Sequence, residues 1–547
     1  MDSIKRRDYQ TEVLVLGSGA AGCAAAITAA RAGAKVLLVD KGVLESSGNL
    51  GGGNDHFMAV LDHESENDDL HALEGFFGNP FWAMSKELIR KYYAAMKPAI
   101  ATLEDAGVEL MKNDDGSYMR SLGFGQPGPW WIHINHGYTV KPKLAKYIKK
   151  LGVNVLNNFM VTHLLKDGDC IAGCAGFDVL KGDFIVVNCK AAVMALGNIA
   201  ERVSNNSTHK PYNVWFSPFV TGSQVILSLE AGAGVQRIDV SDCCTMLPKS
   251  WGAPGMNGIN NMGGFEINAL GERFMDKYDP NAENGDRKNQ VLGTYLQITE
   301  GYGPPFYMDM RHFTPEAARH LQYDLMPGDK ETYLDYCRAR DIDFSKKPLE
   351  VEISERGIGG VLWTDDNQET EIKNLFNGCG GMGFSGSFCT GWNAGQAAAE
   401  RAKSIETPKT PEGMVEEIRA TLFLPLSPAP GYLSYGEFED CIRQVVDYYL
   451  GFKRTWKGLE CALNSLSVLK ENVSRLGAQT LREFMRVREA MELFKFVNIY
   501  VQAVMQRKES GRAQYMIAEY PKLDPKYNKI LLTKLDADGN PVFSWIE

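Results

Sequence analysis

A glycine-rich turn near the N-terminus has the residue types and spacing of a dinucleotide-binding site. Gly17, Gly19 and Gly22 form a G-x-G-x-x-G motif directly after residues 12–16, an apolar run that predicts a buried parallel strand. In such a turn, the first glycine allows the tight bend and the second lets the backbone approach a pyrophosphate. The third lets the next helix pack closely on the sheet, and the N-terminus of that helix attracts the negative charge.

An acidic residue follows at the distance that this site needs. The alanine-rich segment after the turn predicts a helix that Gly33 can end, and the strand KVLLVD then ends in Asp40. Asp40 lies 18 positions after Gly22, where an acid accepts hydrogen bonds from ribose hydroxyls. Because strand, turn, helix, strand and acid occur in this order, the segment predicts a dinucleotide site.

A second glycine-rich loop, SSGNLGGGNDHF at residues 46–57, comes soon after Asp40. Four glycines leave its backbone open to close approach by a ligand. Asn54 and His56 near its end are either substrate contacts or part of the wall. His133 and His136 lie further along, in the aromatic stretch GPWWIHINHG, without an acid or cysteine at metal-ligand spacing, so no metal site is expected.

The segment between residues 160 and 197 favours FAD over NAD. It contains short apolar runs separated by Asp-Gly and Gly-Asp pairs, which predict antiparallel strands, and it ends in the apolar strand and small-residue turn AAVMALG. An NAD dehydrogenase usually continues its alternating strands and helices instead. Antiparallel strands inserted into a Rossmann domain are typical of flavoproteins with two glycine-rich dinucleotide segments.

Length and composition exclude several classes. A chain of 547 residues is too long for one core, and a net charge of −10 argues against general nucleic-acid binding. The sequence has no apolar run long enough to span a bilayer and no signal peptide, so a cytoplasmic location without membrane insertion is expected. The 11 cysteines form no CxxC pair, so the chain is expected to ligate no iron–sulfur cluster itself.

Five segments, in order, resemble the flavoprotein subunits of the succinate dehydrogenase and fumarate reductase superfamily, and the α subunit of adenylylsulfate (APS) reductase in particular. They are WFSPFVTGSQVILSLEAGAG (215–234), EINALGERFMDKYDP (266–280), TEGYGPPFYMDMRH (299–312), GFSGSFCTGWNAGQAAAERA (383–402) and RKESGRAQYMIAEYPKLD (507–524). The resemblance covers nearly the whole chain. It implies an α/β protein with a Rossmann-like FAD domain that contains inserted antiparallel strands.

The same resemblance implies a division into domains. The FAD domain comprises residues 1–242 and 352–405, and a capping domain of residues 243–351 closes over it. A C-terminal helical domain follows at 406–547, where long amphipathic patterns after the proline-rich break at 424–433 also predict helices.

The expected cofactor is dissociable FAD, because family members that attach FAD covalently carry a histidine at the position of Gly48. The glycine-rich segment NLFNGCGGMGFSGSF (374–388) lacks the acid that the family places against FAD, so two serines are expected to replace it. The predicted FAD-binding residues are Gly17, Gly19, Ala20, Ala21, Gly22, Asp40, Lys41, Ser47, Gly48, Gly52, Gly53, Asn54, Ala195, Gly197, Ser385 and Ser387.

Departures from the family pattern concern the substrate. Leu292 stands where the fumarate reductase branch has a proton-carrying arginine, and Glu355 stands where a substrate-binding histidine is found. Trp215 keeps the place of the adenine-stacking tryptophan of APS reductase, whereas Met246 replaces its substrate-binding arginine. We therefore expect a paralogue with a different, anionic or aromatic, small-molecule substrate.

The candidate catalytic residues are Glu355, Arg356, Trp215, His56 and His136. A carboxyl shielded from water beside the flavin would suit Glu355 to general acid catalysis, and Arg356 could bind an anionic group of the substrate. The alternative is that Glu355 and Arg356 form an ion pair that closes a domain boundary. By resemblance, His136-Gly137 matches a histidine-glycine pair that precedes a lysine-proline segment in APS reductase.

The resemblance implies an FAD-dependent catalytic subunit that performs two-electron chemistry at flavin N5 and exchanges electrons with a ferredoxin-like [4Fe-4S] partner subunit. Two other functions stay open. One is a standalone enoate or ketone reductase of the fumarate reductase type, and the other is a non-catalytic electron-transfer flavoprotein in a larger complex.

Overall fold

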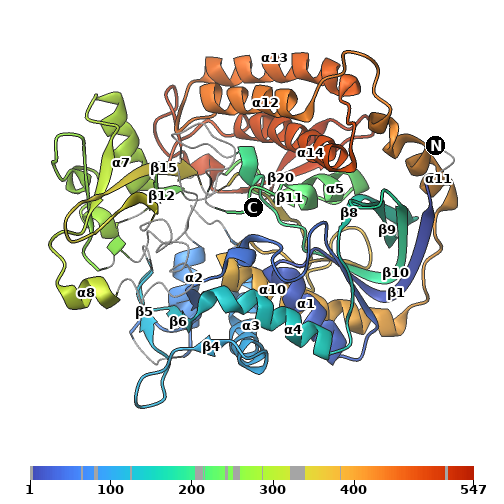
Figure 1. Cartoon of the computed structure of the whole chain (residues 1–547), viewed down its shortest axis with the longest axis horizontal. Helices are drawn as coiled ribbons and strands as arrows, with labels where there is room; N and C mark the ends of the chain where they lie inside the picture. Colours follow the sequence, from blue (N-terminus) through green and yellow to red (C-terminus); the bar gives the residue numbers. More distant parts are fainter. Residues whose placement is uncertain are drawn as a thin grey trace.

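The chain is seen here in a computed structural model. It describes residues 4–546 except for 63–65, 79–83, 124–125, 204–213, 215, 241–243, 250–258, 261, 286, 321–338, 356, 382 and 512–514. Figure 1 shows a central sheet with helices on both sides, a smaller sheet at one end of the long axis, and a layer of long C-terminal helices across one face.

The central sheet has seven strands. They are β1 (Arg6–Leu16), β2 (Val36–Val39), β7 (Asn154–Leu156), β8 (Phe159–Asp167), β9 (Cys170–Asp178), β10 (Phe184–Met194) and β17 (Leu375–Asn377). The order is β7-β2-β1-β10-β9-β8, with β17 beside the end of β10. Strands β7, β2, β1, β10 and β17 pair in parallel, while β8, β9 and β10 pair antiparallel. Both the Rossmann-like half and the inserted antiparallel strands are therefore confirmed.

Alternating side chains of β1 enter two different cores. Val13 and Val15 pack with the helices of one face, and Leu14 and Leu16 pack with those of the other. The first face carries α1 (Ala20–Arg31), α2 (Leu70–Phe77), α3 (Lys86–Asp105), α4 (Val140–Lys150) and α10 (Gly383–Ser404), and the second carries α5 (Ser223–Ala231). Helices α1 and α10 pack so closely that a Cβ at Gly391 would lie 2.1 Å from the carbonyl oxygen of Ala21.

A small antiparallel sheet continues the first face. Its strands are β3 (His56–Met58), β4 (Glu109–Leu110), β5 (Arg120–Ser121) and β6 (Trp131–Asn135). Strand β6 pairs with all three others, and His56 lies opposite His133 in the register. The end of the glycine-rich loop at residues 46–57, called the glycine loop below, is therefore fixed beside the aromatic stretch that contains His136.

The capping segment contains its own antiparallel sheet, in the order β12-β15-β14-β13. The strands are β12 (Cys244–Pro248), β13 (Phe265–Ile267), β14 (Phe306–Asp309) and β15 (Leu349–Glu355), accompanied by α7 (Arg287–Thr299) and α8 (Pro315–His320). Phe274, Met308 and Leu349 lie in a separate hydrophobic core there. Because β15 runs to Glu355, it crosses the boundary expected at 351, and the domain division stays a prediction.

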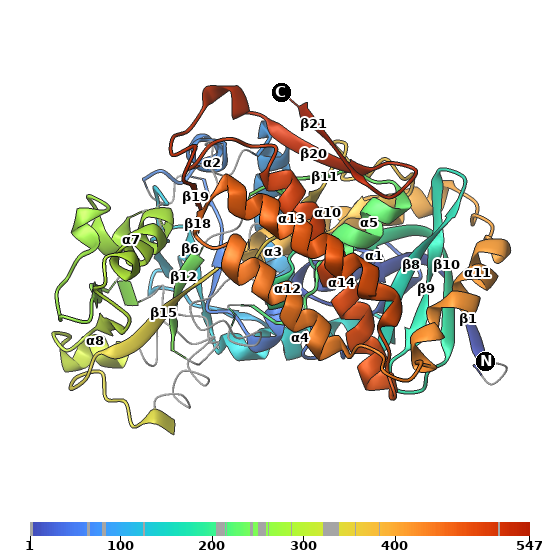
Figure 2. The same cartoon turned by 90° about the horizontal axis from the view of Figure 1, so that it is seen from above.

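In the part of the chain after residue 406 that the structure describes, four α-helices follow, as the amphipathic patterns predict. They are α11 (Glu412–Leu422), α12 (Tyr435–Tyr449), α13 (Trp456–Asn472) and α14 (Leu481–Val504). Figure 2 shows α12, α13 and α14 lying side by side across the molecule. Among the described residues, no helix combines the length and the apolar character that a membrane crossing requires.

The last part of the chain is not helical. It forms β19 (Met516–Ile517), β20 (Ile530–Leu535) and β21 (Pro541–Ile546), which complete small sheets with β18 (Lys453–Arg454), β11 (Val235–Gln236) and β16 (Val361–Leu362). Strands β20 and β21 form a hairpin around Asp538-Gly539, and Gly539 has a φ of +78°. An Asp-Gly pair between alternating apolar residues is a hairpin signal, which the amphipathic helical interpretation of this region did not include.

Short 3₁₀ helices occur at η1 (Asn49–Gly52), η2 (Gly137–Thr139), η3 (Glu201–Val203), η4 (Met275–Lys277), η5 (Ala282–Asn284), η7 (Leu424–Leu426), η8 (Val473–Arg475) and η9 (Pro525–Tyr527).

Candidate cofactor and active site

A cavity of about 580 Å³ opens where β1, β2 and β10 end. Ligands of open α/β sheets bind at this place, beyond the carboxyl ends of the strands. Twelve of the predicted FAD-binding residues line the cavity: Gly17, Gly19, Ala20, Ala21, Asp40, Lys41, Ser47, Gly48, Asn54, Ala195, Gly197 and Ser387. The local motifs thus meet in one site, although they are up to 370 positions apart in the chain.

The dinucleotide turn requires glycine for steric reasons. Gly17 has a φ of +99°, and a Cβ there would lie 2.3 Å from the carbonyl oxygen of Ala195. A Cβ at Gly22 would lie 1.8 Å from the carbonyl oxygen of Gly17, so Gly22 brings α1 against the strand and does not line the cavity. Gly19 is the N-cap of α1 and has no capping side chain, which leaves the first amide groups of the helix open to a phosphate.

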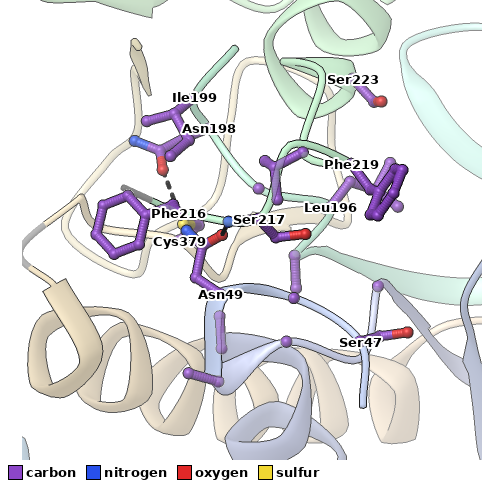
Figure 3. A pocket seen from close by; sticks show the side chains of 18 of the residues that line it. Ser47, Asn49, Leu196, Asn198, Ile199, Phe216, Ser217, Phe219, Ser223 and Cys379 are labelled. Carbon is purple, nitrogen blue, oxygen red and sulfur yellow. Dashed lines mark hydrogen bonds between the residues drawn. The ribbon is translucent and has the colours of Figure 1, made fainter. Parts of the chain in front are cut away.

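The glycine loop lies directly against this turn. Gly48 has a φ of +76°, and a Cβ there would lie 2.7 Å from the Cα of Gly19. Asn49 accepts a hydrogen bond from the amide of Ser217 at 3.2 Å, which ties the loop to the opposite wall (Figure 3). The site therefore has the glycine cradle that a dinucleotide needs. Gly52 and Gly53, which were also predicted to bind FAD, belong to the loop but do not line the cavity.

Asp40 organises the segments around it. Its Oδ2 accepts hydrogen bonds from the amide and the hydroxyl of Ser18 at 2.7 and 2.8 Å. Its Oδ1 accepts from the amide of Gly42 at 2.7 Å and from the hydroxyl of Ser47 at 2.8 Å. A carboxylate offers about four acceptor positions. To donate to Asp40, a ribose hydroxyl would therefore have to take the place of the hydroxyl of Ser18 or Ser47. Both serine hydroxyls can rotate away.

A buried cation lies behind the dinucleotide turn. Lys141 of α4 has no exposed surface, and its ammonium group donates to the carbonyl oxygen of Ser18 and to Sγ of Cys23, the latter at 3.2 Å. This contact fixes the carbonyl between Gly17 and Gly19 and adds positive charge near the place where a pyrophosphate would bind.

The glycine-rich segment 374–388 contributes Ser387 and Cys379 to the cavity. Sγ of Cys379 donates to Oδ1 of Asn198 at 3.3 Å (Figure 3), and burial raises the pKa of this thiol. Ser385 does not line the cavity. It is buried inside α10, and its hydroxyl accepts a hydrogen bond from Tyr92 at 3.2 Å, so its side chain is turned away from the cavity.

His56 lies next to the cavity rather than in its wall. Its Nδ1 lies 2.7 Å from Oδ1 of Asp55, and its ring stacks on Trp131 with the centroids 4.0 Å apart. Burial disfavours the charged form of Asp55, but His56, a backbone hydrogen bond and His133 together outweigh burial and lower the pKa of Asp55. The geometry is that of a histidine oriented by a carboxylate.

His136 lies in the left-handed region with a φ of +49°. The amide of Asn54 donates to the carbonyl of Gly137 at 3.4 Å, so His136 is held near the end of the glycine loop. Its Nδ1 is buried and has no hydrogen-bond partner among the residues that the structure describes. Like His56, it does not line the cavity.

Glu355 is buried at the end of β15, with 3% of its surface exposed. Gly359 and Gly360, four and five positions later, line the cavity, but Glu355 itself does not. The pKa of buried Tyr500 lies above its usual range, chiefly because of burial, and the Glu355 carboxylate adds to the rise. Glu355 therefore lies close to both the cavity and the C-terminal helices. Both interpretations of Glu355 stay open: a general acid beside the flavin, or a partner of Arg356 that closes a domain boundary. Trp215 and Arg356 lie outside the described residues.

Most of the residues that line the cavity were not predicted from the sequence. They are Gly42, Val43, Ser46, Asn49, Leu50, Phe159, Met160, Val161, Leu196, Asn198, Ile199, Phe216, Ser217, Phe219, Val220, Ser223, Arg237, Val240, Gly359, Gly360, Val361, Cys379, Gly381, Gly383, Phe384, Met485, Arg486 and Glu489. The Gly359-Gly360 pair was a local signal that could have been used. Nothing local distinguishes Arg486 or Glu489 from the other charged residues of an amphipathic helix.

Comparison with known proteins gives a family match and a shared fold. Residues 12–401 match the family model described as the FAD binding domain. One component of the fumarate reductase (CoM/CoB) of Methanothermobacter marburgensis is 22% identical over 551 aligned residues, which cover 96% of this chain and 97% of that protein.

Two solved structures have a TM-score of 0.87 with this chain. The adenylylsulfate reductase of Archaeoglobus fulgidus is 23% identical, with 100% of this chain and 97% of that chain aligned. The quinol fumarate reductase of E. coli is 21% identical, with 99% and 97% aligned. At these identities, the structural likeness shows the fold.

Proposed function

The chain belongs to the FAD binding domain family, and on that premise we propose that it is the catalytic flavoprotein subunit of an oxidoreductase similar to APS reductase. It is an FAD-dependent oxidoreductase. We further propose that its electrons pass to or from a ferredoxin-like [4Fe-4S] partner subunit, and that its substrate is a small anionic or aromatic molecule. The observation that carries the proposal is the cavity in which the dinucleotide turn, the glycine loop and Gly359–Gly360 meet.

When bound, FAD supplies the two-electron chemistry. The chain would hold its diphosphate with the open amides of α1 and the backbone of Gly19 and Gly48. The apolar side chains of Met160, Val161 and Ile199 in the wall would keep water away. His56, oriented by Asp55, would hold a proton near the end of the glycine loop, and this contact with Asp55 supports the proposed role.

The residues at two positions argue against fumarate and APS as substrates. Leu292, at the place of the family's proton-carrying arginine, packs against the core of the capping segment. Met246, at the place of the substrate-binding arginine of APS reductase, is buried with 3% of its surface exposed. Neither side chain can carry a proton or bind an anion, so the proposed substrate is neither fumarate nor APS.

The test is the reoxidation of the dithionite-reduced flavin, followed anaerobically by its absorbance. We expect fast electron exchange with a [4Fe-4S] ferredoxin and slow reoxidation by fumarate or APS. Fast reoxidation by fumarate without ferredoxin would instead identify the standalone reductase. Exchange with ferredoxin, but with no substrate found in a broad screen of anionic acceptors, would favour the electron-transfer flavoprotein.

Replacing Glu355 with glutamine is expected to keep FAD bound and to lower turnover at least tenfold, because glutamine cannot hold and release the proton. FAD content and turnover with the identified substrate are the two measurements. Full turnover in Glu355→Gln would show that Glu355 is not the general acid and would leave only its role in an ion pair at the domain boundary. Glu471→Gln, an exposed substitution on α13, is the control.

FAD is expected to leave the chain when the protein is denatured, since Gly48 offers no side chain for a covalent bond. Acid precipitation followed by absorbance of the supernatant measures this. Flavin that stays with the precipitated chain through a denaturing gel would contradict the prediction.

A further inference from the structure

Helix α14 forms part of the cofactor cavity. Its residues Met485, Arg486 and Glu489 line the cavity together with Lys41, two positions after the end of β2. Figures 1 and 2 show α14 crossing the molecule in the layer of C-terminal helices. A helix from the far end of the sequence thus closes one end of the FAD site.

A buried ionic network ties α14 to this site. Oε1 of Glu489 accepts from Nζ of Lys41 at 2.7 Å, and Oε2 accepts from Arg486 at 2.5 Å and from Arg202 at 3.0 Å. Arg202 also pairs with Glu439 of α12 at 2.7 Å. Glu489 and Arg202 have no exposed surface, so this network is built into the fold.

The network places cations at the wall of the cavity, and the buried carboxylate of Glu492 also lies close enough to Lys41 for the two charges to attract each other. In the described part of the chain the network joins three cations, Lys41, Arg202 and Arg486, with two carboxylates, those of Glu439 and Glu489. Two of these cations, Lys41 and Arg486, line the cavity. Both side chains keep some exposed surface, 25% for Lys41 and 12% for Arg486, so each can contact an anion in the cavity. The diphosphate of the cofactor is such an anion.

The position of Arg486 indicates which part of the cofactor it faces. Lys41 follows Asp40, which stands at the ribose position of the dinucleotide motif, so this end of the cavity takes the adenosine half. The Arg486 guanidinium lies 4.5 Å from the ring centroid of Phe219, another lining residue, which is labelled in Figure 3. Stacking on Phe219 and pairing with Glu489 hold the guanidinium in one place.

We propose that Arg486 binds the adenosine diphosphate half of FAD, so that α14 completes the cofactor site and selects FAD over shorter flavins. This inference rests on FAD as the cofactor, and it is independent of the proposed substrate and iron–sulfur partner.

The test uses the full chain after removal of FAD, titrated separately with ADP, FMN and FAD by calorimetry. Arg486→Met is expected to raise the Kd for ADP and FAD at least tenfold and to leave the Kd for FMN within twofold. Arg482→Met, an exposed substitution one turn earlier on α14, is the matched control and is expected to change none of the three.

Unchanged ADP and FAD affinity in Arg486→Met would overturn the inference, and so would an equal loss for ADP, FMN and FAD. If Arg486→Met does not fold, Arg486→Lys takes its place. Lysine keeps the charge but lacks the planar guanidinium, so a two- to fivefold loss of affinity is expected for ADP and FAD, with the Kd for FMN unchanged. Failure of the wild-type chain to bind FAD would instead refute the cofactor assignment. A failed substrate screen would leave the affinities, and thus this inference, untouched.

Discussion

Replacing Gly48 with alanine is expected to abolish stable FAD binding, whereas Gly52→Ala in the same loop is expected to retain it. Gly48 has a φ of +76°, which costs an alanine about 1–2 kcal/mol, and the new Cβ would lie 2.7 Å from the Cα of Gly19. Relief of that contact must move the glycine loop away from the dinucleotide turn. Because both backbones form the cradle, we expect the affinity for FAD to fall at least 100-fold.

Gly52 is the matched control. It belongs to the same loop, it does not have a positive φ, and a Cβ there would meet no atom within 4 Å. The measurements are the molar ratio of FAD to protein after purification and the Kd of the FAD-free chain, with circular dichroism to show that both variants are folded. Equal FAD content in the two variants would show that the cofactor does not depend on the contact between the loop and the turn.

Features of the site that lie within one short stretch of sequence could be predicted, because the steric cause of each feature lies in the same stretch. Gly17, Gly22 and Asp40 are identified by spacing, since the turn, the helix packing and the acid all lie within one strand–helix–strand unit. The inserted antiparallel strands were predictable for the same reason, because Gly168 and Gly182 mark turns with φ of +59° and +74°. Such features depend on neighbours a few positions away.

Residues whose role depends on distant segments were not predictable. Ser385 is adjacent to cavity residues in the sequence, yet its hydroxyl is turned toward Tyr92, which lies 293 positions away. Arg486 and Glu489 look like ordinary charged residues of an amphipathic helix until α14 is placed over Lys41. No periodicity or spacing rule contains that information, because it arises only when the C-terminal helices pack on the sheet.

Replacing Glu489 with glutamine is expected to lower the free energy of unfolding by about 3–5 kcal/mol, the range for removing one partner of a buried ionic network. The substitution removes the one carboxylate that pairs with all three cations, Lys41, Arg202 and Arg486. Glu489 and Arg202 have no exposed surface, so water does not readily replace the lost partner. The shift of the urea unfolding midpoint measures the effect, with the exposed substitution Glu471→Gln as the control. A loss below about 1 kcal/mol would mean that water or rearranged side chains compensate the cations.

The same network predicts how this loss depends on pH. Burial disfavours the charged carboxylate of Glu489, but Lys41, Arg202 and Arg486 outweigh burial and lower its pKa from 4.5 to about 2. A carboxyl with a lowered pKa in the folded state stabilises the protein above its unfolded pKa, and this stabilisation is lost as the pH falls from about 4.5 toward 2. The difference in unfolding free energy between wild type and Glu489→Gln should therefore be constant from about pH 7 to 6 and about 1 kcal/mol smaller at about pH 4. A difference that grows on acidification would mean that Glu489 is protonated in the folded protein and does not pair with the three cations as a carboxylate.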